Sequence, residues 1–281
     1  MLKLKNVYKD YYDFEFELKD ISFELEEGYI MGLIGPNGAG KTTIINLIMN
    51  LMKPTKGEIE IFGRKNILEN NEYIKDNIGF VFDESIYPPY LNLDKLEFIH
   101  KNTYSNFDKE YFDELVDRFK ISKLKKLKDQ SKGNIMRTQI VLALSHNAKF
   151  IVMDEPSQGL DPVVRRELLK VLREYRERTD AAILFSTHIT EDLEQIADYI
   201  TFINRGELVF TTDIESLRDK YKILKTTTEK KRLYDGQNFI GFEEKDSYFS
   251  GLIEKENIKN LAEGDILREA TIQDIMYYYG K

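Results

Sequence analysis

The sequence has no cysteine, no long apolar run and no excess of positive charge. Without cysteine, the chain can form neither a disulfide nor a thiolate metal site. Its apolar runs, such as YIMGLI and FIVM, are much shorter than the about 20 residues that a helix needs to cross a bilayer. A net charge of −8 at pH 7 argues against a broad nucleic-acid surface, so no nucleic-acid partner is expected. These absences leave a globular protein as the expected class.

The N-terminus and the composition favour a protein of the cytosol. The opening residues, MLKLKNVYKDYYDFEF, are interrupted by charge throughout, unlike the apolar stretch of a signal peptide. Apolar residues make up 42% and charged residues 32% of the chain, which is typical of a globular protein. For 281 residues we expect one large domain, or one domain with a smaller appendage.

The order of apolar runs indicates an α/β fold. The first 30 residues alternate apolar and polar positions, which predicts short antiparallel strands. Apolar runs at 29–35, 149–154 and 181–187 predict buried strands, and each is followed by a helical pattern. Residues 199–210 are predicted as one further strand. Strands that alternate with helices imply a largely parallel sheet with helices on both faces.

Two segments depart from this alternation. From about Pro88 to Lys120 the pattern is helical, which predicts an inserted helical lobe placed at about 84–146. The apolar stripe expected to be buried in this lobe consists of Tyr111, Phe112, Leu115, Val116 and Phe119. The composition changes again after residue 212, so we predict a main domain over 1–212 and a small accessory segment over 213–281.

A glycine-rich loop between the first buried strand and its helix is typical of phosphate binding. Its sequence, GPNGAGKT at residues 35–42, has two glycines flanking four residues, then lysine and threonine. Glycines let consecutive backbone N–H groups point at phosphates, and the following helix adds its positive end. Lys41 is predicted to bind the β- and γ-phosphates of a nucleotide, and the Thr42 hydroxyl to ligate Mg²⁺.

A pair of acidic residues follows the buried strand at 149–154. In an open α/β sheet, ligands bind at the carboxyl ends of the strands, which is where Asp154 and Glu155 lie. Asp154 can hold Mg²⁺ directly or through water. Glu155 is the candidate to orient and deprotonate the attacking water. Two acids after a strand are often just a helix start, but the phosphate loop favours the catalytic interpretation.

Over residues 1 to about 212 the chain resembles the ATP-binding subunit of an ABC transporter. GLIGPNGAGKTT matches the first motif of that family, VMDEPSQGLDP matches its Walker B strand and D-loop, and FSTH matches its switch histidine. The resemblance implies a P-loop NTPase fold with a RecA-like parallel-sheet core, an antiparallel β subdomain, an inserted helical subdomain and a small C-terminal extension. It also implies that His188 contacts the γ-phosphate and steadies Glu155, and that Asp161 in the D-loop contributes to nucleotide binding. The ATP-binding loop that it assigns comprises Gly35, Pro36, Asn37, Gly38, Ala39, Gly40, Lys41, Thr42 and Thr43.

The stretch QSKGN, residues 130–134, stands where this family has its Leu-Ser-Gly-Gly-Gln signature. Ser131 and Gly133 are retained, whereas Lys132 replaces a glycine and adds charge. By itself, the stretch is also an ordinary helix start. The resemblance implies that Ser131 and the backbone N–H groups at this helix start grip the ATP held by an opposite subunit. A site completed by two chains requires a dimer.

Two further positions follow from the same alignment. Asp83 stands where a glutamine normally binds Mg²⁺ and senses the membrane partner. An aspartate is a competent Mg²⁺ ligand, so metal binding can persist. Tyr11 stands where an aromatic residue commonly stacks on adenine, with Tyr12 and Phe14 as rivals. An edge or core role for this aromatic remains an alternative.

The resemblance implies an ATPase subunit that forms a homodimer, or a heterodimer with a related ATPase subunit, and powers a separate transmembrane permease. Such a subunit would lie in the cytoplasm, bound to the inner face of the membrane through the permease. VFDES, QSKGN and the tail TIQDIMYYYGK are similar to single-domain subunits of ABC-2-type multidrug, bacitracin or lantibiotic exporters. The alternatives are a soluble ABC-type ATPase of translation or DNA maintenance and a regulatory subunit that does not transport. The single ATP domain and the lack of extended heptads disfavour the former.

Overall fold

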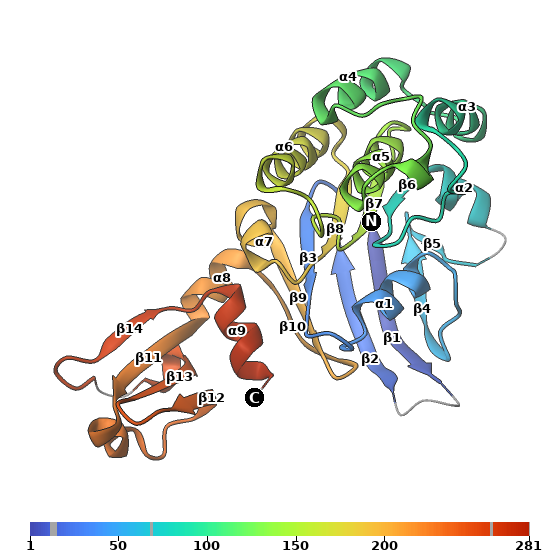
Figure 1. Ribbon diagram of the computed structural model, residues 1–281. Helices are drawn as coiled ribbons and strands as arrows, with labels where there is room; N and C mark the ends of the chain where they lie inside the picture. The colour runs from blue at the N-terminus through green and yellow to red at the C-terminus, as the bar shows by residue number, and fades with distance from the viewer. Residues whose placement is uncertain (12–15, 68–69, 259–260, 281) are drawn as a thin grey trace.

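The computed structural model describes residues 1–11, 16–67, 70–258 and 261–280, which form an α/β unit and a smaller C-terminal unit (Figure 1). A ten-stranded sheet has the order β5-β4-β1-β2-β10-β9-β3-β8-β7-β6, and a four-stranded sheet has the order β12-β13-β11-β14. The strands are β1 Leu2–Asp10, β2 Glu17–Leu25, β3 Ile30–Ile34, β4 Lys56–Ile61, β5 Arg64–Lys65, β6 Ile78–Val81, β7 Phe150–Asp154, β8 Ala182–Ser186, β9 Tyr199–Asn204, β10 Glu207–Asp213, β11 Tyr221–Thr227, β12 Phe239–Glu244, β13 Tyr248–Glu254 and β14 Ile266–Glu269. The helices are α1 Lys41–Ile48, α2 Asn71–Asp76, α3 Leu93–Thr103, α4 Lys109–Phe119, α5 Lys132–Leu144, α6 Pro162–Thr179, α7 Thr190–Ile196, α8 Ile214–Lys220 and α9 Ile272–Tyr279.

Parallel strands form the centre of the large sheet, as the alternation of strands and helices predicts. β6 pairs with β7, β7 with β8, and β3 with both β8 and β9, all in parallel. Every residue of β3, β7 and β8 is buried. In β7, Ile151 and Met153 face a core that includes side chains of α4, α5 and α6, whereas Phe150 and Val152 face a second core that includes α1. A sheet covered on both faces explains why these strands are continuous apolar runs.

α1 packs between the antiparallel strands and the parallel strands. β1 pairs with β2 and β4, and β4 pairs with β5, in antiparallel register. Apolar residues of β1, β2 and β4 share one core with those of α1, so this helix packs between the antiparallel layer and the parallel strands. One parallel pairing, between Glu207 and Lys19, joins β10 to β2. The helix that follows the phosphate loop is therefore anchored on two sides.

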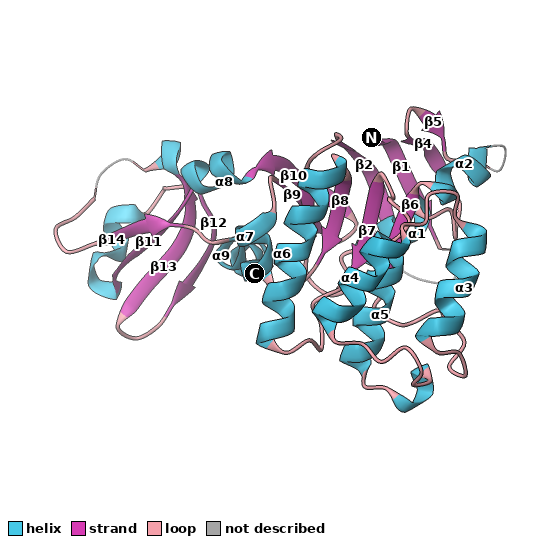
Figure 2. Cartoon of the chain, turned by 90° about the horizontal axis from the view of Figure 1, so that it is seen from above, coloured by secondary structure: helices cyan, strands magenta, loops and turns pink. Residues whose placement is uncertain are grey.

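The predicted helical lobe contains α3, α4 and α5, which lie with α6 on the same side of the strands (Figure 2). The five residues of the apolar stripe on α4 are all buried, as predicted. α5 packs directly on β6: a Cβ built on Gly79 would lie 2.3 Å from the carbonyl oxygen of Ala143. This close approach fixes α5 relative to the strand that precedes Asp83.

The prediction of one strand over 199–210 is wrong, because the segment is a hairpin of β9 and β10. Arg205 and Gly206 turn the chain with φ values of 49° and 77°. Two consecutive left-handed residues are the geometry of a tight hairpin turn, and glycine at the second position is a common signal for it. A Cβ at Gly206 would also lie 1.9 Å from the Glu17 carbonyl oxygen, so a side chain has no room there.

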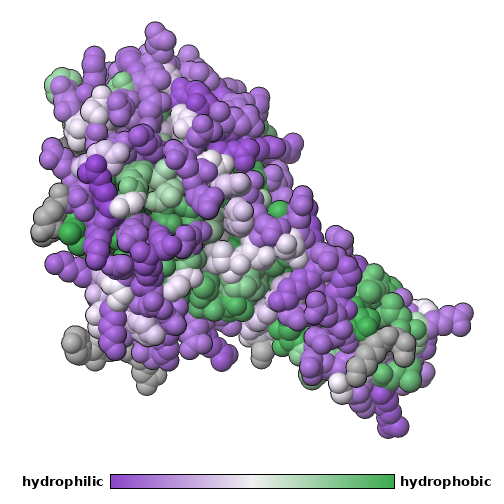
Figure 3. Space-filling view, turned by 180° about the vertical axis from the view of Figure 1, so that it is seen from behind, coloured by the Kyte–Doolittle hydropathy of each residue, from purple (hydrophilic) through white to green (hydrophobic). Residues whose placement is uncertain are grey.

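The C-terminal segment contains α8, the four-stranded antiparallel sheet and α9. α8 ends at Lys220, and β11 begins at the next residue, Tyr221. α9 returns to the main unit: Ile272 donates its backbone N–H to Glu194 Oε1 of α7 over 3.0 Å, and Asn204 Nδ2 donates to the Tyr279 carbonyl over 3.2 Å. Apolar side chains are exposed on this segment (Figure 3). Within the described residues, every helix is too short or too polar to span a bilayer.

We predict that Gly79→Ala lowers the free energy of unfolding by about 1–3 kcal/mol, because the added methyl group forces α5 away from β6. Chemical denaturation followed by circular dichroism measures this change. The control is Gly280→Ala, where a Cβ would lie 3.3 Å from its nearest neighbour, the Met276 carbonyl oxygen, and the backbone has a φ of −84°. Its effect should stay within about 0.5 kcal/mol. Equal unfolding midpoints for the two variants would show that the contact between α5 and β6 is not tight.

Candidate functional site

The phosphate loop connects β3 to α1 through three glycines with positive φ: Gly35 at 157°, Gly38 at 79° and Gly40 at 111°. At Gly35, a Cβ would lie 2.2 Å from the carbonyl oxygen of Ile203, so the loop closely contacts the neighbouring strand. α1 begins at Lys41, and no described side chain caps its first turn. Its first backbone N–H groups are therefore available to an anion.

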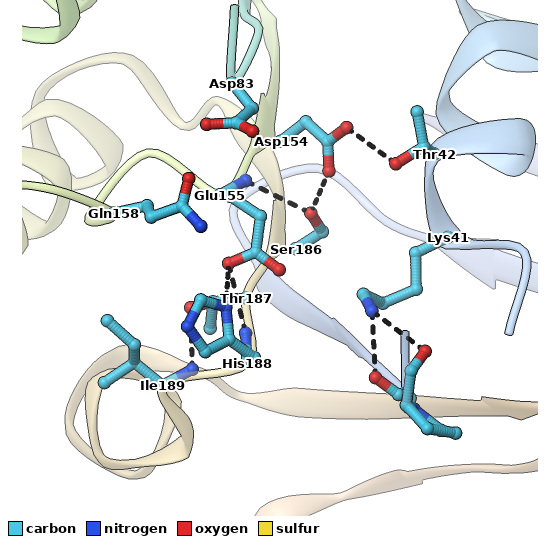
Figure 4. Close-up of polar contacts among 12 residues, drawn as sticks. Lys41, Thr42, Asp83, Asp154, Glu155, Gln158, Ser186, Thr187, His188 and Ile189 are labelled. Carbon is cyan, nitrogen blue, oxygen red and sulfur yellow. Dashed lines mark hydrogen bonds and ion pairs between the residues drawn. The ribbon is translucent and has the colours of Figure 1, made fainter. Parts of the chain in front are cut away.

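A cavity of about 520 Å³ lies against this loop, between segments that are far apart in the sequence. Its walls come from the phosphate loop and from the segments that follow β6, β7 and β8 (Figure 4). The lining residues are Phe16, Asn37, Gly38, Ala39, Gly40, Lys41, Thr42, Thr43, Asp83, Glu155, Gln158 and His188. Most of the predicted phosphate-loop residues thus meet Glu155, His188 and Asp83 around one space.

Asp154 is held at the carboxyl end of β7 by two hydroxyl groups. Thr42 Oγ1 donates to Asp154 Oδ2 over 3.0 Å, and Ser186 Oγ donates to Asp154 Oδ1 over 2.5 Å. Asp154 is 4% exposed, so its carboxylate has little contact with bulk water. The Thr42 hydroxyl and the Asp154 carboxylate are oxygen donors of the kind that Mg²⁺ prefers, and they face each other beside the phosphate loop.

Glu155 has a constrained backbone and a fixed carboxylate. Its φ is 51°, a left-handed value that is uncommon for a residue with a side chain, and its N–H donates to the Ser186 carbonyl over 3.0 Å. Glu155 Oε2 lies 2.7 Å from His188 Nδ1 and accepts the His188 backbone N–H over 3.2 Å. The segment after β8 therefore orients the carboxylate that faces the cavity.

Lys41 folds over its own loop. Its Nζ donates to the Gly35 carbonyl over 2.8 Å and to the Pro36 carbonyl over 3.3 Å. Burial lowers the pKa of the Lys41 ammonium, while the charges of Glu155 and Asp154 act in the opposite direction. A buried ammonium held by carbonyl oxygens is poised to exchange these contacts for the charged oxygens of a phosphate.

The signature residues lie away from this cavity. Ser131 caps α5 and accepts the Asn134 N–H over 3.3 Å, as the helix-start interpretation predicts. A Cβ on Gly133 would lie 3.0 Å from the Gly159 carbonyl oxygen, so α5 begins against the segment after β7. Asp161 caps α6 by accepting the backbone N–H groups of Val163 and Val164 over 3.0 and 3.1 Å, and these bonds lower its pKa. The nucleotide roles of Ser131, Gly133 and Asp161 stay predictions.

The two departures from the family pattern contact each other. Lys132 Nζ lies 2.7 Å from Asp83 Oδ1 and donates to Gln158 Oε1 over 2.9 Å. Asp83 and Gln158 line the cavity, whereas Lys132 is the first residue of α5. This cluster cannot be read from the sequence, because it depends on three segments that only the fold brings together.

Among the residues that the structure describes, Phe16 is the phenylalanine or tyrosine that lines the cavity. Tyr11 does not line it, and its hydroxyl lies 3.4 Å from Met52 Sδ. The rivals Tyr12 and Phe14 lie outside the described residues. A Cβ on Gly40 would lie 3.0 Å from Phe16 Cζ, so this ring is beside the phosphate loop. Ser186 was not predicted as a site residue. Its place at the end of a buried strand, two residues before His188, was a usable signal in the sequence.

Comparisons with known proteins agree with this geometry. A family model described as ABC transporter matches residues 18–158. The chain is 34% identical over 197 residues to the uncharacterised ABC transporter ATP-binding protein YdbJ of Bacillus subtilis, covering 68% of this chain and 62% of that protein. It is 30% identical over 204 residues to the ABC transporter ATP-binding protein YtrB of Bacillus subtilis, covering 73% and 69%. It is 31% identical over 204 residues to the bacitracin transport ATP-binding protein BcrA of Bacillus licheniformis, covering 71% and 66%.

Solved structures give the same result. A structure of the ATP binding subunit of an ABC transporter superposes with a TM-score of 0.71 at 26% identity, covering 78% of this chain and 92% of that one. A dimeric, post-hydrolysis ATP-binding cassette bound to ADP and Pi superposes with a TM-score of 0.69 at 26% identity, covering 76% and 99%. The family match and these relatives show that the chain belongs to the ABC transporter family, as an ATP-binding subunit with ATPase activity.

Proposed function

We propose that this subunit hydrolyses ATP at a Mg²⁺-dependent site that a second subunit completes, and that hydrolysis powers a separate membrane permease. The contact between Glu155 and His188, beside Lys41 in one cavity, carries the proposal. A carboxylate held by a neighbouring group and facing a phosphate site is the arrangement needed to orient and deprotonate water. His188 keeps Glu155 in place and contacts the γ-phosphate.

The phosphate-binding role rests on the loop and Lys41. Backbone N–H groups at the start of α1 hold the phosphate oxygens, and Lys41 leaves the Gly35 and Pro36 carbonyls to pair with the β- and γ-phosphates. Phe16 supports the adenine, in the role predicted for Tyr11, because its ring lines the cavity. These contacts place the terminal phosphate next to Glu155.

Thr42 and Asp154 fit a Mg²⁺ ion, with Asp83 at the edge of the same space. Mg²⁺ in nucleotide sites usually takes one or two carboxylates together with phosphate oxygens and water, which two converging oxygen donors allow. The ion shields the phosphate charge during hydrolysis. In this proposal, Ser186 keeps the Asp154 carboxylate turned toward Thr42.

A second subunit supplies the signature residues, which do not line the cavity of their own chain. Ser131 and Gly133 begin α5 outside the cavity of their own chain, where they can meet the nucleotide of an opposite copy. A dimeric relative bound to ADP and Pi supports this arrangement. We propose a homodimer, or a heterodimer with a related ATPase subunit, in which Asp161 also lies at the nucleotide.

The permease is proposed to dock beside Asp83. A hollow of about 280 Å³ reaches Phe82, the residue before Asp83, and is lined mainly by apolar side chains from the end of α1 and the residues after it, from α2 and β6, and by Ile86. Leu51, Ile86 and Phe98 are exposed apolar residues at 64%, 56% and 70%, and the first two lie on this hollow. Contact with a membrane subunit would place this protein on the inner face of the membrane. Export as the proposed direction rests on the resemblance of VFDES, QSKGN and the C-terminal tail to exporter subunits.

We predict that Lys41→Ala weakens ATP binding by about 10- to 100-fold, because a charge-assisted contact to the phosphates is lost. Titration with a fluorescent ATP analogue measures this change. Lys170→Ala is the matched control, since Lys170 is 62% exposed on α6 and makes only a 3.7 Å ion pair. An affinity equal to that of the wild-type chain would remove Lys41 from the phosphate site.

We predict that Glu155→Gln lowers the turnover number by at least about 100-fold but retains ATP binding, because the amide keeps the shape and loses the base. ATP should then hold the variant as a dimer in gel filtration. Glu177→Gln, at a position 68% exposed on α6, is the control and should behave as wild type. Normal phosphate release together with an unchanged monomer peak would refute both the catalytic role and the ATP-bound dimer.

A further inference from the structure

Lys132 is an unusual residue for the position it occupies. It is the first residue of α5, whose first turn contains no acidic residue among those described. The positive end of a helix disfavours a cation there. The side chain instead leaves the helix and reaches Asp83 and Gln158, with its Nζ 2.7 and 2.9 Å from their oxygens. These two contacts offset the unfavourable position of the ammonium.

The same contacts join the start of α5 to the nucleotide cavity of its own chain. Asp83 follows β6 and Gln158 follows β7, and both line the cavity beside Glu155. The Gln158 N–H also donates to the Glu155 carbonyl over 3.0 Å. Gly133 and Gly159 pack closely behind Lys132. The Lys132 ammonium therefore connects the start of α5 to Asp83 and Gln158, two residues of the nucleotide cavity.

The proposed function gives both charges of the pair a second role. Asp83 Oδ1 accepts from Lys132, yet Asp83 lines the same cavity as Thr42, one of the residues proposed to hold Mg²⁺. Lys132 directly follows Ser131, the residue proposed to meet the phosphates of the opposite nucleotide, at the start of α5. The side chains of Lys132 and Asp83 are 54% and 39% exposed, so solvent weakens their attraction and the pair can exchange.

We propose that the ion pair of Lys132 with Asp83 is an internal latch that MgATP and dimerisation break. In the free subunit, Lys132 holds the carboxylate of Asp83. In the ATP-bound dimer, Asp83 turns to the metal of its own site, and Lys132 turns to the phosphates held by the opposite subunit. Metal binding at a subunit's own site and phosphate binding at the opposite site both require the ion pair of Lys132 with Asp83 to break. The ion pair therefore couples the two ATP sites. This inference rests on the proposed function.

A double-mutant cycle in the Glu155→Gln background tests the first half of the proposal. The readout is the Mg²⁺ concentration for half-maximal binding of a fluorescent ATP analogue, at protein concentrations that keep the chain monomeric. With Asp83 present, Lys132→Met should lower this concentration about two- to fivefold, the range of an exposed ion pair. Combined with Asp83→Asn, it should have no effect. An equal shift in both backgrounds, or none in either, would overturn the latch.

Dimerisation tests the second half. In chains that carry Asp83→Asn no charged latch remains, so Lys132→Met reports on the contact with the opposite nucleotide alone. It should raise the protein concentration for half-maximal ATP-driven dimerisation about tenfold, whereas Lys132→Arg should retain most of the affinity. Dimerisation equal to that of the Asp83→Asn single variant would reject the contact with the opposite phosphates.

A matched control separates the latch from general charge effects. Lys255→Met removes another exposed lysine–aspartate pair, in which Lys255 Nζ lies 2.5 Å from Asp219 Oδ1 in the C-terminal segment. It should change neither Mg²⁺ dependence nor dimerisation, and a shift equal to that of Lys132→Met would overturn the proposal. If the Glu155→Gln chain binds no ATP at all, the proposed function fails, and the latch fails with it.

Discussion

The burial of the parallel strands on both faces is the constraint on which the site depends. Every residue of β3, β7 and β8 is packed between two cores, so these strands cannot slip by one residue without placing their apolar side chains wrongly. Their register places Asp154 opposite Ser186, and Ser186 opposite Leu33 of β3. The chain leaves all three strands at one edge. The phosphate loop, the two acids and His188 therefore meet as a consequence of packing.

Local sequence patterns predicted those parts of the site that a single segment can specify. The phosphate loop needs its glycines at fixed spacing, and Asp154 and Glu155 follow an apolar run, so both were recognisable in the sequence. Contacts between distant segments were not: Lys132 and Asp83 are 49 residues apart, and their pairing depends on how α5 packs on β6. The choice of the adenine-stacking aromatic residue stays a prediction, because several candidates lie close together before β2 and a sequence does not show which one faces the cavity.

The fold was predictable to a similar degree. Continuous apolar runs identified the buried strands, and the apolar stripe on α4 identified its packed face, because the positions that are buried are occupied by apolar residues. The hairpin at Arg205 and Gly206 was missed because two short strands with a tight turn have the same apolar content as one strand. The position of the C-terminal segment could not be predicted either. It is fixed by α9, which packs against α7, the short helix that begins two residues after His188.

The central claim is that ATP joins the phosphate loop of one subunit to the signature turn of another. Because the chain has no cysteine, two thiols can be introduced without a competing partner. In the Glu155→Gln background, one protein carries Ser131→Cys and the other Asn37→Cys, and the two are mixed under mild oxidation. The account predicts a covalent dimer with one copy of each, formed with MgATP and absent without it. A mixed dimer that fails to form with MgATP, or that forms equally well without nucleotide, would contradict the account.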